Sequence, residues 1–91
     1  MTAQQERILV VEGDHAVADL ISRQTLKPLC FRVKVIRDAP MALQEVKNFL
    51  PDIMIVNLDL PGLSGKDLLV ALSSQGVDLP VILSLSFPLY G

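Results

Sequence analysis

The 91-residue chain has no tryptophan, a single cysteine and few aromatic residues, which make up 4% of the sequence. The lone Cys30 excludes an internal disulfide and has no Cys or His at metal-ligand spacing, so we expect a buried or half-buried apolar residue. The apolar residues, 51% of the chain, are therefore mainly Ile, Leu, Val and Ala. This composition is typical of a folded globular core and not of a disordered segment.

The chain also lacks an excess of positive charge and any long apolar run. Its net charge of −2 gives no basic surface for a nucleic-acid backbone or anionic lipid, so we expect neither as a direct partner. The longest purely apolar runs, such as residues 53–56, are far shorter than the roughly 20 residues that cross a bilayer. Residues 1–7 are polar and carry no secretory signal, which predicts a cytoplasmic protein.

Four short segments have the composition of β-strands. Residues 8–11, 53–56 and 81–85 are apolar and rich in β-branched residues, a pattern that predicts strands buried on both faces. Residues 31–36 instead alternate between apolar and basic side chains. That alternation is typical of an edge strand with one face toward water.

Helical spacing of apolar residues predicts three helices between these strands. Their expected ranges are 15–27, 40–49 and 65–74. Asp14 and Asp38 stand where a side chain can cap the first and second helices. Pro28 should end the first helix and push Lys27 away from helical angles, and Gly76 should end the third.

Strict alternation of strand and helix predicts one α/β domain over residues 1–91, built on a parallel sheet with helices on both faces. The length leaves no room for a second domain. Met41 and Met54 are expected in its core.

Polar residues follow the first and third predicted strands. Glu12 and Asp14 come after the first, and Asn57 and Asp59 come at the end of the third. Because ligands of parallel α/β sheets bind at the carboxyl ends of the strands, we expect these four side chains to converge. Oxygen-rich sites of this kind suit Mg²⁺.

The segments 7–14 (Arg-Ile-Leu-Val-Val-Glu-Gly-Asp) and 51–65, with its Asn57-Leu-Asp-Leu-Pro-Gly run, together resemble a response-regulator receiver domain. The resemblance implies a flavodoxin-like, doubly wound parallel sheet with strand order 2-1-3-4. It also implies that the usual fourth helix, fifth strand and fifth helix are absent from this chain, so the domain over residues 1–91 is expected to be incomplete at its C-terminal end.

The resemblance assigns roles to the polar positions. The family's phosphoacceptor aspartate falls on Asn57, and its second acid, a direct magnesium ligand, falls on Gly13. Glu12 matches the first acid, and Asp59 matches a position that offers the metal only its backbone carbonyl. Two central carboxylates are therefore missing, and an amide is neither a nucleophile nor a charge that neutralises a cation.

The family's serine or threonine switch position falls on Leu85, which Ser84 and Ser86 flank. The family's lysine after the fifth strand has no counterpart before the chain stops at Gly91. The fourth strand would then be an open apolar edge. We expect a homodimer through this edge, a partner protein, or further sequence that continues the domain.

The sequence therefore predicts a pseudo-receiver of a two-component phosphorelay, which is not an enzyme and works by protein contact with a histidine kinase or an output domain. No cofactor is expected, and Mg²⁺ would bind weakly at most, through Glu12, Asn57 and Asp59. One alternative is a receiver that accepts phosphate or Mg²⁺ at Asp59 or Asp14. Another is a small-ligand binder at the strand ends, because fold does not fix function.

The basic residues are scattered along the chain and are expected on solvated faces. They include Arg23, Lys27, Arg32, Lys34 and Arg37. A basic rim of this kind around the second strand indicates an acidic protein partner.

Overall fold

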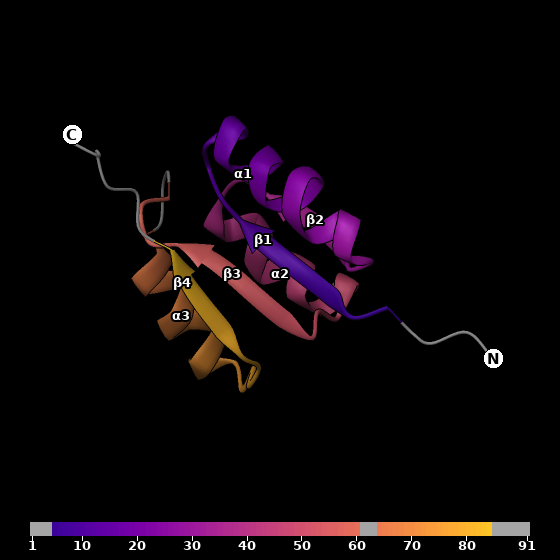
Figure 1. Ribbon diagram of the computed structural model, residues 1–91. Coiled ribbons are helices and arrows are strands. Elements are labelled where there is room, and N and C mark those ends of the chain that lie inside the picture. The colour runs from indigo at the N-terminus through magenta and orange to yellow at the C-terminus, as the bar shows by residue number, and fades with distance from the viewer. Residues whose placement is uncertain (1–4, 61–63, 85–91) are drawn as a thin grey trace.

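The computed structural model describes residues 5–60 and 64–84, which form a four-stranded parallel sheet with helices on both faces (Figure 1). The main elements are β1 (Arg7–Val11), α1 (His15–Ile21), β2 (Arg32–Ile36), α2 (Ala39–Phe49), β3 (Ile53–Asn57), α3 (Gly65–Ser74) and β4 (Val81–Ser84). The strand order is β2-β1-β3-β4, which confirms the predicted α/β class and order 2-1-3-4. No helix of these residues has the length and apolar character to cross a membrane.

Strand β1 lies in the middle of the molecule and is buried on both faces. Successive side chains of a strand point to opposite faces, so Leu9 and Val11 share one face and Ile8 and Val10 the other. The first pair belongs to the main core, which also contains residues of α2 and α3 such as Leu68. Figure 1 shows α2 and α3 on that face and α1 on the opposite face. Burial on both faces explains the continuous apolar run of β1.

Strand β2 is the edge strand that its alternation predicts. Arg32 and Lys34 are exposed, whereas Val33 and Val35 are half-buried. Lys34 Nζ lies 2.7 Å from Oε1 of Glu45, which ties β2 to α2.

The ends of α2 and α3 follow the predicted signals. Asp38 Oδ1 accepts a hydrogen bond from Met41 N over 2.9 Å, as expected of an N-cap, although α2 begins at Ala39 and not at residue 40. Ser64 Oγ accepts one from Asp67 N at the start of α3. Gly76 follows α3 with a φ of 76°, a conformation that favours glycine.

The prediction that Pro28 ends the first helix was wrong. Helix α1 continues into a π-helical segment, η1 (Ser22–Leu26), and a 3₁₀ turn, η2 (Lys27–Leu29). Lys27 keeps right-handed helical angles, with φ −63° and ψ −41°. Pro28 lies in the first turn of η2, where its missing N–H is not required for the hydrogen bonds of the helix.

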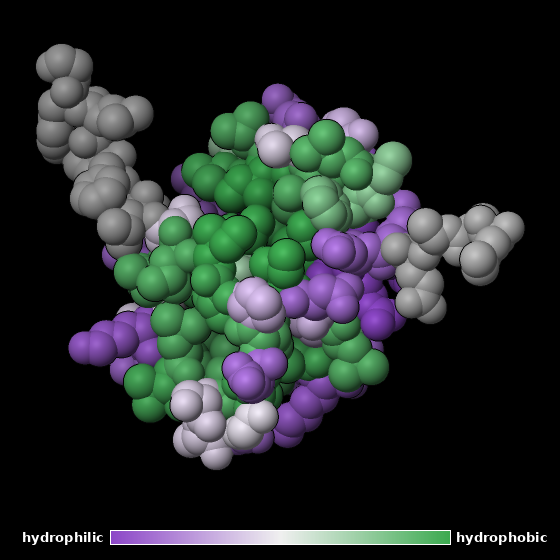
Figure 2. All heavy atoms as spheres, turned by 60° about the horizontal axis from the view of Figure 1, so that its bottom comes forward, coloured by the Kyte–Doolittle hydropathy of each residue, from purple (hydrophilic) through white to green (hydrophobic). Residues whose placement is uncertain are grey.

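The prediction that the fourth strand is buried on both faces was also wrong. Ile82 and Leu83 of β4 are 55% and 51% exposed, and their side chains alternate between the two faces of the sheet. The cause is position, because β4 has a single neighbouring strand, β3, among the described residues. Figure 2 shows that much of one face of the molecule is apolar.

Two single-residue expectations need correction as well. Met41 is 52% exposed, because Ala39, Ala42 and Val46 form the buried stripe of α2 and turn Met41 outward. Cys30 is exposed, since it occupies the turn before β2 with a left-handed φ of 69°. Met54 is fully buried in the core, as predicted.

Candidate functional site

The candidate site lies at the carboxyl ends of β1 and β3, the two central strands. Val11 and Val56 are partners in the parallel register, so the next residues, Glu12 and Asn57, leave the sheet side by side. A hydrogen bond from Glu12 N to Ile36 O, 3.0 Å long, holds the end of β1 against β2. Parallel pairing thus brings together two polar residues that are far apart in the sequence, as predicted.

Glu12 and Asn57 are joined by a direct side-chain hydrogen bond. Asn57 Nδ2 donates to Oε2 of Glu12 over 2.7 Å, and each residue is 2% exposed. The short distance is typical of a hydrogen bond to an ionised acceptor. Among the described residues, no buried side-chain nitrogen or oxygen lacks a hydrogen-bond partner. The hydrogen bond from the amide therefore offsets part of the free-energy cost of burying the Glu12 carboxylate.

Backbone groups engage the remaining oxygen atoms of this pair. Glu12 Oε1 accepts a hydrogen bond from Asp14 N over 3.0 Å. Asn57 Oδ1 accepts one from Asp59 N over 2.8 Å, which closes an Asx turn after β3. Both carboxylate oxygens of Glu12 thus accept N–H groups, and the orientation of the Asn57 amide is fixed from both ends.

The side chains of Asp14 and Asp59 lie outside this buried pair. Both residues are exposed, and Asp14 Oδ1 caps α1 by accepting hydrogen bonds from Ala16 N (2.9 Å) and Val17 N (3.2 Å). The four predicted polar residues therefore meet at one edge, but the contact between side chains joins only Glu12 and Asn57. Asp14 and Asp59 reach the pair through their backbone N–H groups.

Gly65 allows α3 to approach the candidate site closely. The sequence predicted only that a helix begins at this residue. A Cβ atom on Gly65 would lie 2.7 Å from Asn57 O and 2.7 Å from Leu58 Cα, both of them backbone atoms. Gly65 N also donates to Leu58 O over 3.0 Å. The N-terminus of α3 can approach the end of β3 this closely only because residue 65 lacks a side chain.

The register of β4 places a hydroxyl residue opposite Asn57. Ser84 is the partner of Asn57 in the parallel pairing of β3 and β4, and Ser84 O accepts a hydrogen bond from Leu58 N over 3.0 Å. The family's switch position is expected at Leu85, one residue further along the chain. Leu85 and Ser86 lie outside the described residues.

The residues of this edge do not fit a divalent cation well. Mg²⁺ requires several oxygen ligands in near-octahedral geometry. Among the described residues, the one buried carboxylate is Glu12, which already accepts two N–H groups, and Gly13 has no side chain to offer. No group of three or more His, Cys, Asp or Glu residues in the described part of the chain could hold a metal ion.

His15 and Arg37 form a second polar contact near this edge. Arg37 Nη1 and His15 Nε2 are hydrogen-bonded between the start of α1 and the end of β2. The guanidinium group has only donors, so Arg37 is the donor of this contact. Both residues are exposed.

A family model described as the response regulator receiver domain matches residues 8–86 of the chain. The chain is 31% identical over 83 residues to the DNA-binding response regulator MtrA of Mycolicibacterium smegmatis. The aligned region covers 91% of this chain and 36% of that protein. It is 34% identical over 76 residues to the response regulator MprA of Mycobacterium sp. strain KMS, and the aligned region covers 84% of this chain and 33% of that protein. The chain thus spans about a third of the length of these relatives.

Solved receiver domains have the same fold. The BeF3-activated N-terminal receiver domain of Klebsiella pneumoniae RstA matches with a TM-score of 0.83 and 28% identity, over 91% of this chain and 69% of that chain. The signal receiver domain of the putative Luxo repressor protein of Vibrio parahaemolyticus matches with a TM-score of 0.83 and 26% identity, over 90% and 62%. A CheY-like receiver domain from Methylobacillus flagellatus, 22% identical, shares the fold with a TM-score of 0.82. The strand order, the polar strand ends and the match over residues 8–86 agree, and the chain belongs to the response regulator receiver domain family.

Proposed function

We propose that this receiver domain is a pseudo-receiver, which takes part in two-component signalling by protein contact and not by accepting a phosphoryl group. One observation carries the proposal: the side chain at the acceptor position is the Asn57 amide, whose Nδ2 donates to Glu12 over 2.7 Å. A carboxylate oxygen attacks phosphorus and forms an acyl phosphate, whereas an amide is a poor nucleophile. The buried hydrogen bond also holds the amide nitrogen toward Glu12.

Metal chemistry is proposed to be absent or weak. Phosphoryl transfer relies on a divalent cation to neutralise developing charge. Of the residues that the structure describes at this edge, only Glu12 contributes a buried carboxylate, and both of its oxygens accept N–H groups. Mg²⁺ could still reach Glu12, Asn57 Oδ1 and the backbone of Asp59, with low affinity. We propose no resident cofactor and no catalytic activity for the domain itself.

A rival assignment makes exposed Asp59 the phosphoacceptor. Its support is location, since Asp59 follows β3 by two residues and its backbone N–H already contacts Asn57. Asp14 is a weaker candidate, because its carboxylate caps α1. Small-ligand binding at the same strand ends is a third assignment, for which the Glu12–Asn57 pair offers one buried polar contact.

A phosphorylation experiment separates these assignments. The chain would be incubated with labelled acetyl phosphate and Mg²⁺, and amide NMR spectra would be recorded with Mg²⁺ and then beryllofluoride. We expect no label and no shifts at Glu12, Asn57 or Asp59. Label that Asp59→Ala abolishes would establish the rival, and beryllofluoride shifts at Asn57 would show that the pocket still binds a phosphate analogue. Shifts caused by a neutral metabolite alone would favour the small-ligand assignment.

We further propose that the partners are proteins of a cytoplasmic two-component pathway, a histidine kinase or an output domain, with no direct contact to nucleic acid or membrane. Two relatives are whole response regulators, one described as DNA-binding, and the chain matches about a third of each. The proposed contact surface includes β4, where Ile82 and Leu83 are exposed on a strand with one neighbour among the described residues. Apolar edge strands favour pairing with another strand.

The simplest form of this contact is a homodimer through β4. Analytical ultracentrifugation of the chain should show a concentration-dependent dimer that Ile82→Lys shifts to monomer, because a charged residue opposes strand addition. Val70→Lys is a matched control, since Val70 is also exposed but lies on α3. A chain that stays monomeric at millimolar concentration, or a dimer that both variants disrupt equally, would count against the β4 interface.

A further inference from the structure

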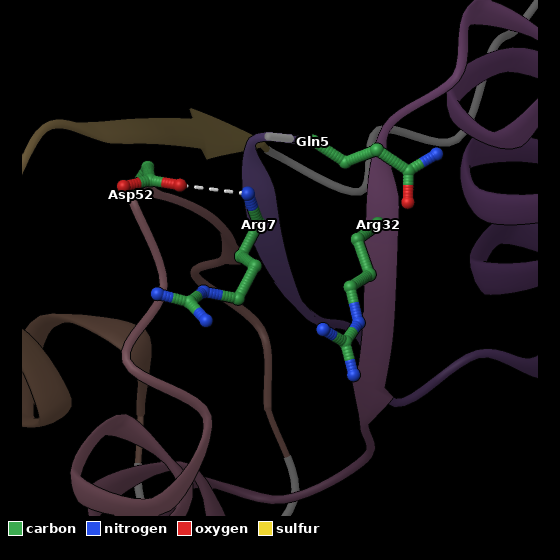
Figure 3. Close-up of a pocket in the computed structure, with 4 residues that line it drawn as sticks. All are labelled: Gln5, Arg7, Arg32 and Asp52. Atoms are coloured by element: carbon green, nitrogen blue, oxygen red, sulfur yellow. Dashed lines mark hydrogen bonds between the residues drawn. The ribbon is translucent and has the colours of Figure 1, made fainter. Parts of the chain in front are cut away.

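A polar pocket lies at the opposite edge of the sheet from the Glu12–Asn57 pair. It has a volume of about 190 Å³ and is lined by Gln5, Arg7, Arg32 and Asp52. Figure 3 shows that the guanidinium groups of Arg7 and Arg32 extend from the neighbouring strands β1 and β2 to the same side. The lining therefore combines two cations with one carboxylate.

The two arginines are brought together by the register of the sheet. Arg7 and Arg32 are partners in the parallel pairing of β1 and β2, and neighbouring strands lie about 4.8 Å apart. Both side chains therefore point to the face that carries α2. Two like charges held side by side repel one another, so this arrangement has a cost that a bound anion would remove.

Arg7 is held in a fixed position by three hydrogen bonds. Its backbone N–H donates to Asp52 Oδ2 over 2.8 Å, and its backbone carbonyl accepts from Asp52 N over 2.7 Å. Its Nε donates to Leu50 O over 3.1 Å, at the C-terminal cap of α2. A guanidinium group has five N–H donors. The bond to Leu50 O uses Nε, so it does not involve the four donors on the two terminal nitrogens.

Neither guanidinium group forms an ion pair with a carboxylate of a described residue. The ion pairs in these residues are Arg23 with Asp19 and Lys34 with Glu45. Lys34, the next residue on the same face of β2, is thus neutralised, whereas Arg7 and Arg32 are not. Asp52 Oδ2 faces the backbone N–H of Arg7 and leaves the pocket with an excess of one positive charge.

We propose that Arg7 and Arg32 form a carboxylate-binding site, whose occupant is an acidic side chain of a partner protein. Arginine binds a carboxylate with two parallel N–H···O bonds, a geometry that a lysine lacks. One excess positive charge matches a carboxylate better than a phosphate dianion, and the Gln5 amide adds a neutral donor. The site lies at the N-terminal ends of β1 and β2, so its occupation does not depend on the acceptor position.

The test is an NMR titration of the 91-residue chain that follows the Arg Nε–Hε signals at constant ionic strength. The probes are a capped peptide with three consecutive Glu residues, the same peptide with Gln in their place, sodium acetate and sodium phosphate. We expect saturable shifts of Arg7 and Arg32 with the Glu peptide and none with the Gln peptide. Saturation by acetate at equal or lower concentration would assign the carboxylate to a small molecule instead of a protein.

Variants distinguish a binding site from a structural role. Arg32→Gln should weaken binding of the Glu peptide about tenfold, and Arg32→Lys should weaken it nearly as much, because the charge remains but the two-pronged geometry is lost. Arg23→Gln is the matched control and should bind like the parent chain, since Arg23 pairs with Asp19. Arg32 is exposed, so the variants are expected to fold, which dispersed amide signals would verify.

Three results would overturn the proposal. Shifts that rise linearly without saturation, or that sodium chloride reproduces, would reduce the site to general charge screening. Equal binding by Arg32→Gln and the parent chain would remove Arg32 from the site. Tighter binding of phosphate than of the Glu peptide would contradict the assignment to carboxylates.

Discussion

Asn57 Nδ2 lies 2.7 Å from Glu12 Oε2, and this hydrogen bond joins the ends of the two central strands in a place where each residue is 2% exposed. The amide N–H of Asn57 therefore faces the Glu12 carboxylate. An aspartate at position 57 would place a second negative charge there, and a cation would be needed between the two carboxylates. An amide N–H and a carboxylate attract each other, whereas two carboxylates in contact repel each other. The stability of the folded domain should therefore depend on the Asn57 amide.

Asn57→Asp should destabilise the domain in the absence of divalent cations. The substitution removes a hydrogen bond to a charged group and sets two carboxylates against each other in a buried site, which should cost roughly 2–4 kcal/mol. Mg²⁺ at millimolar concentration should recover part of the loss. Thermal unfolding with EDTA and with Mg²⁺ measures both effects. Asn48→Asp, at an exposed position of α2, is the matched control and should be nearly neutral in both conditions. An Asn57→Asp variant as stable as the parent in EDTA would show that the amide is unimportant.

Glu12→Ala should be destabilising for the complementary reason. The Asn57 Nδ2 group and Asp14 N would lose their acceptor, and a buried donor without a partner costs about 1–3 kcal/mol. Glu12→Gln should cost less, since its amide oxygen can still accept one of the two hydrogen bonds. Urea denaturation of these variants, with exposed Glu6→Ala as a control, gives the comparison. An equal loss from Gln and Ala at position 12 would mean that the charge, and not the hydrogen bonding, matters.

The sequence predicted the parts of the fold that local patterns determine. Alternation of apolar strands and amphipathic helices specified the parallel α/β class, and Asp38 and Gly76 marked helix ends because capping depends on few neighbouring residues. The meeting of Glu12 with Asn57 followed from the rule that parallel strands end at one edge. These inferences needed no knowledge of three-dimensional contacts.

Other features depend on contacts that no local pattern contains. Ile82 and Leu83 have the composition of a buried strand, but the exposure of a strand depends on its neighbours in the sheet. The pairing of Ser84 with Asn57 is a matter of strand register, which no local sequence pattern contains. The need for glycine at position 65 arises from the approach of α3 to β3, which appears only in the folded chain.

Gly65→Ala should therefore be far more harmful than an ordinary helix substitution. The new Cβ would meet two backbone atoms at 2.7 Å, and neither can move without shifting β3, so we expect a loss of at least about 1–3 kcal/mol. Gly76→Ala is the comparison, because its Cβ would enter open space and meet only the strain of a positive φ, about 1 kcal/mol. The Asn57 side-chain NMR signals should shift in Gly65→Ala and not in Gly76→Ala. Equal stability of the two variants would show that α3 moves away without cost.

Asp14→Ala and Asp59→Ala should differ in stability although both residues are exposed. Asp14 caps α1 through Ala16 N and Val17 N, and loss of an N-cap costs about 1 kcal/mol. Asp59 contributes its backbone N–H to Asn57, so its side chain can be removed with a change within about 0.5 kcal/mol. Urea denaturation measures both values. A large decrease in the free energy of unfolding of Asp59→Ala would show that the Asp59 carboxylate has a structural role that its hydrogen bonds do not explain.

Placing carboxylates at positions 13 and 57 together should give stronger Mg²⁺ binding than placing one at either position alone. Asn57→Asp supplies charge at the end of β3, and Gly13→Asp supplies it beside Glu12, so the double variant offers Mg²⁺ the carboxylates that this edge now lacks. We expect its affinity for Mg²⁺ to exceed that of Asn57→Asp by about tenfold, because each added carboxylate increases the negative charge around the cation. Gly13→Asp alone should bind weakly, since the Asn57 amide still donates to Glu12. Isothermal titration calorimetry of the three variants measures the series, and only the double variant should then accept label from acetyl phosphate. If Asn57→Asp alone binds Mg²⁺ and accepts label as well as the double variant does, Gly13 does not contribute to the proposed lack of phosphorylation, and the identity of residue 57 alone would account for it.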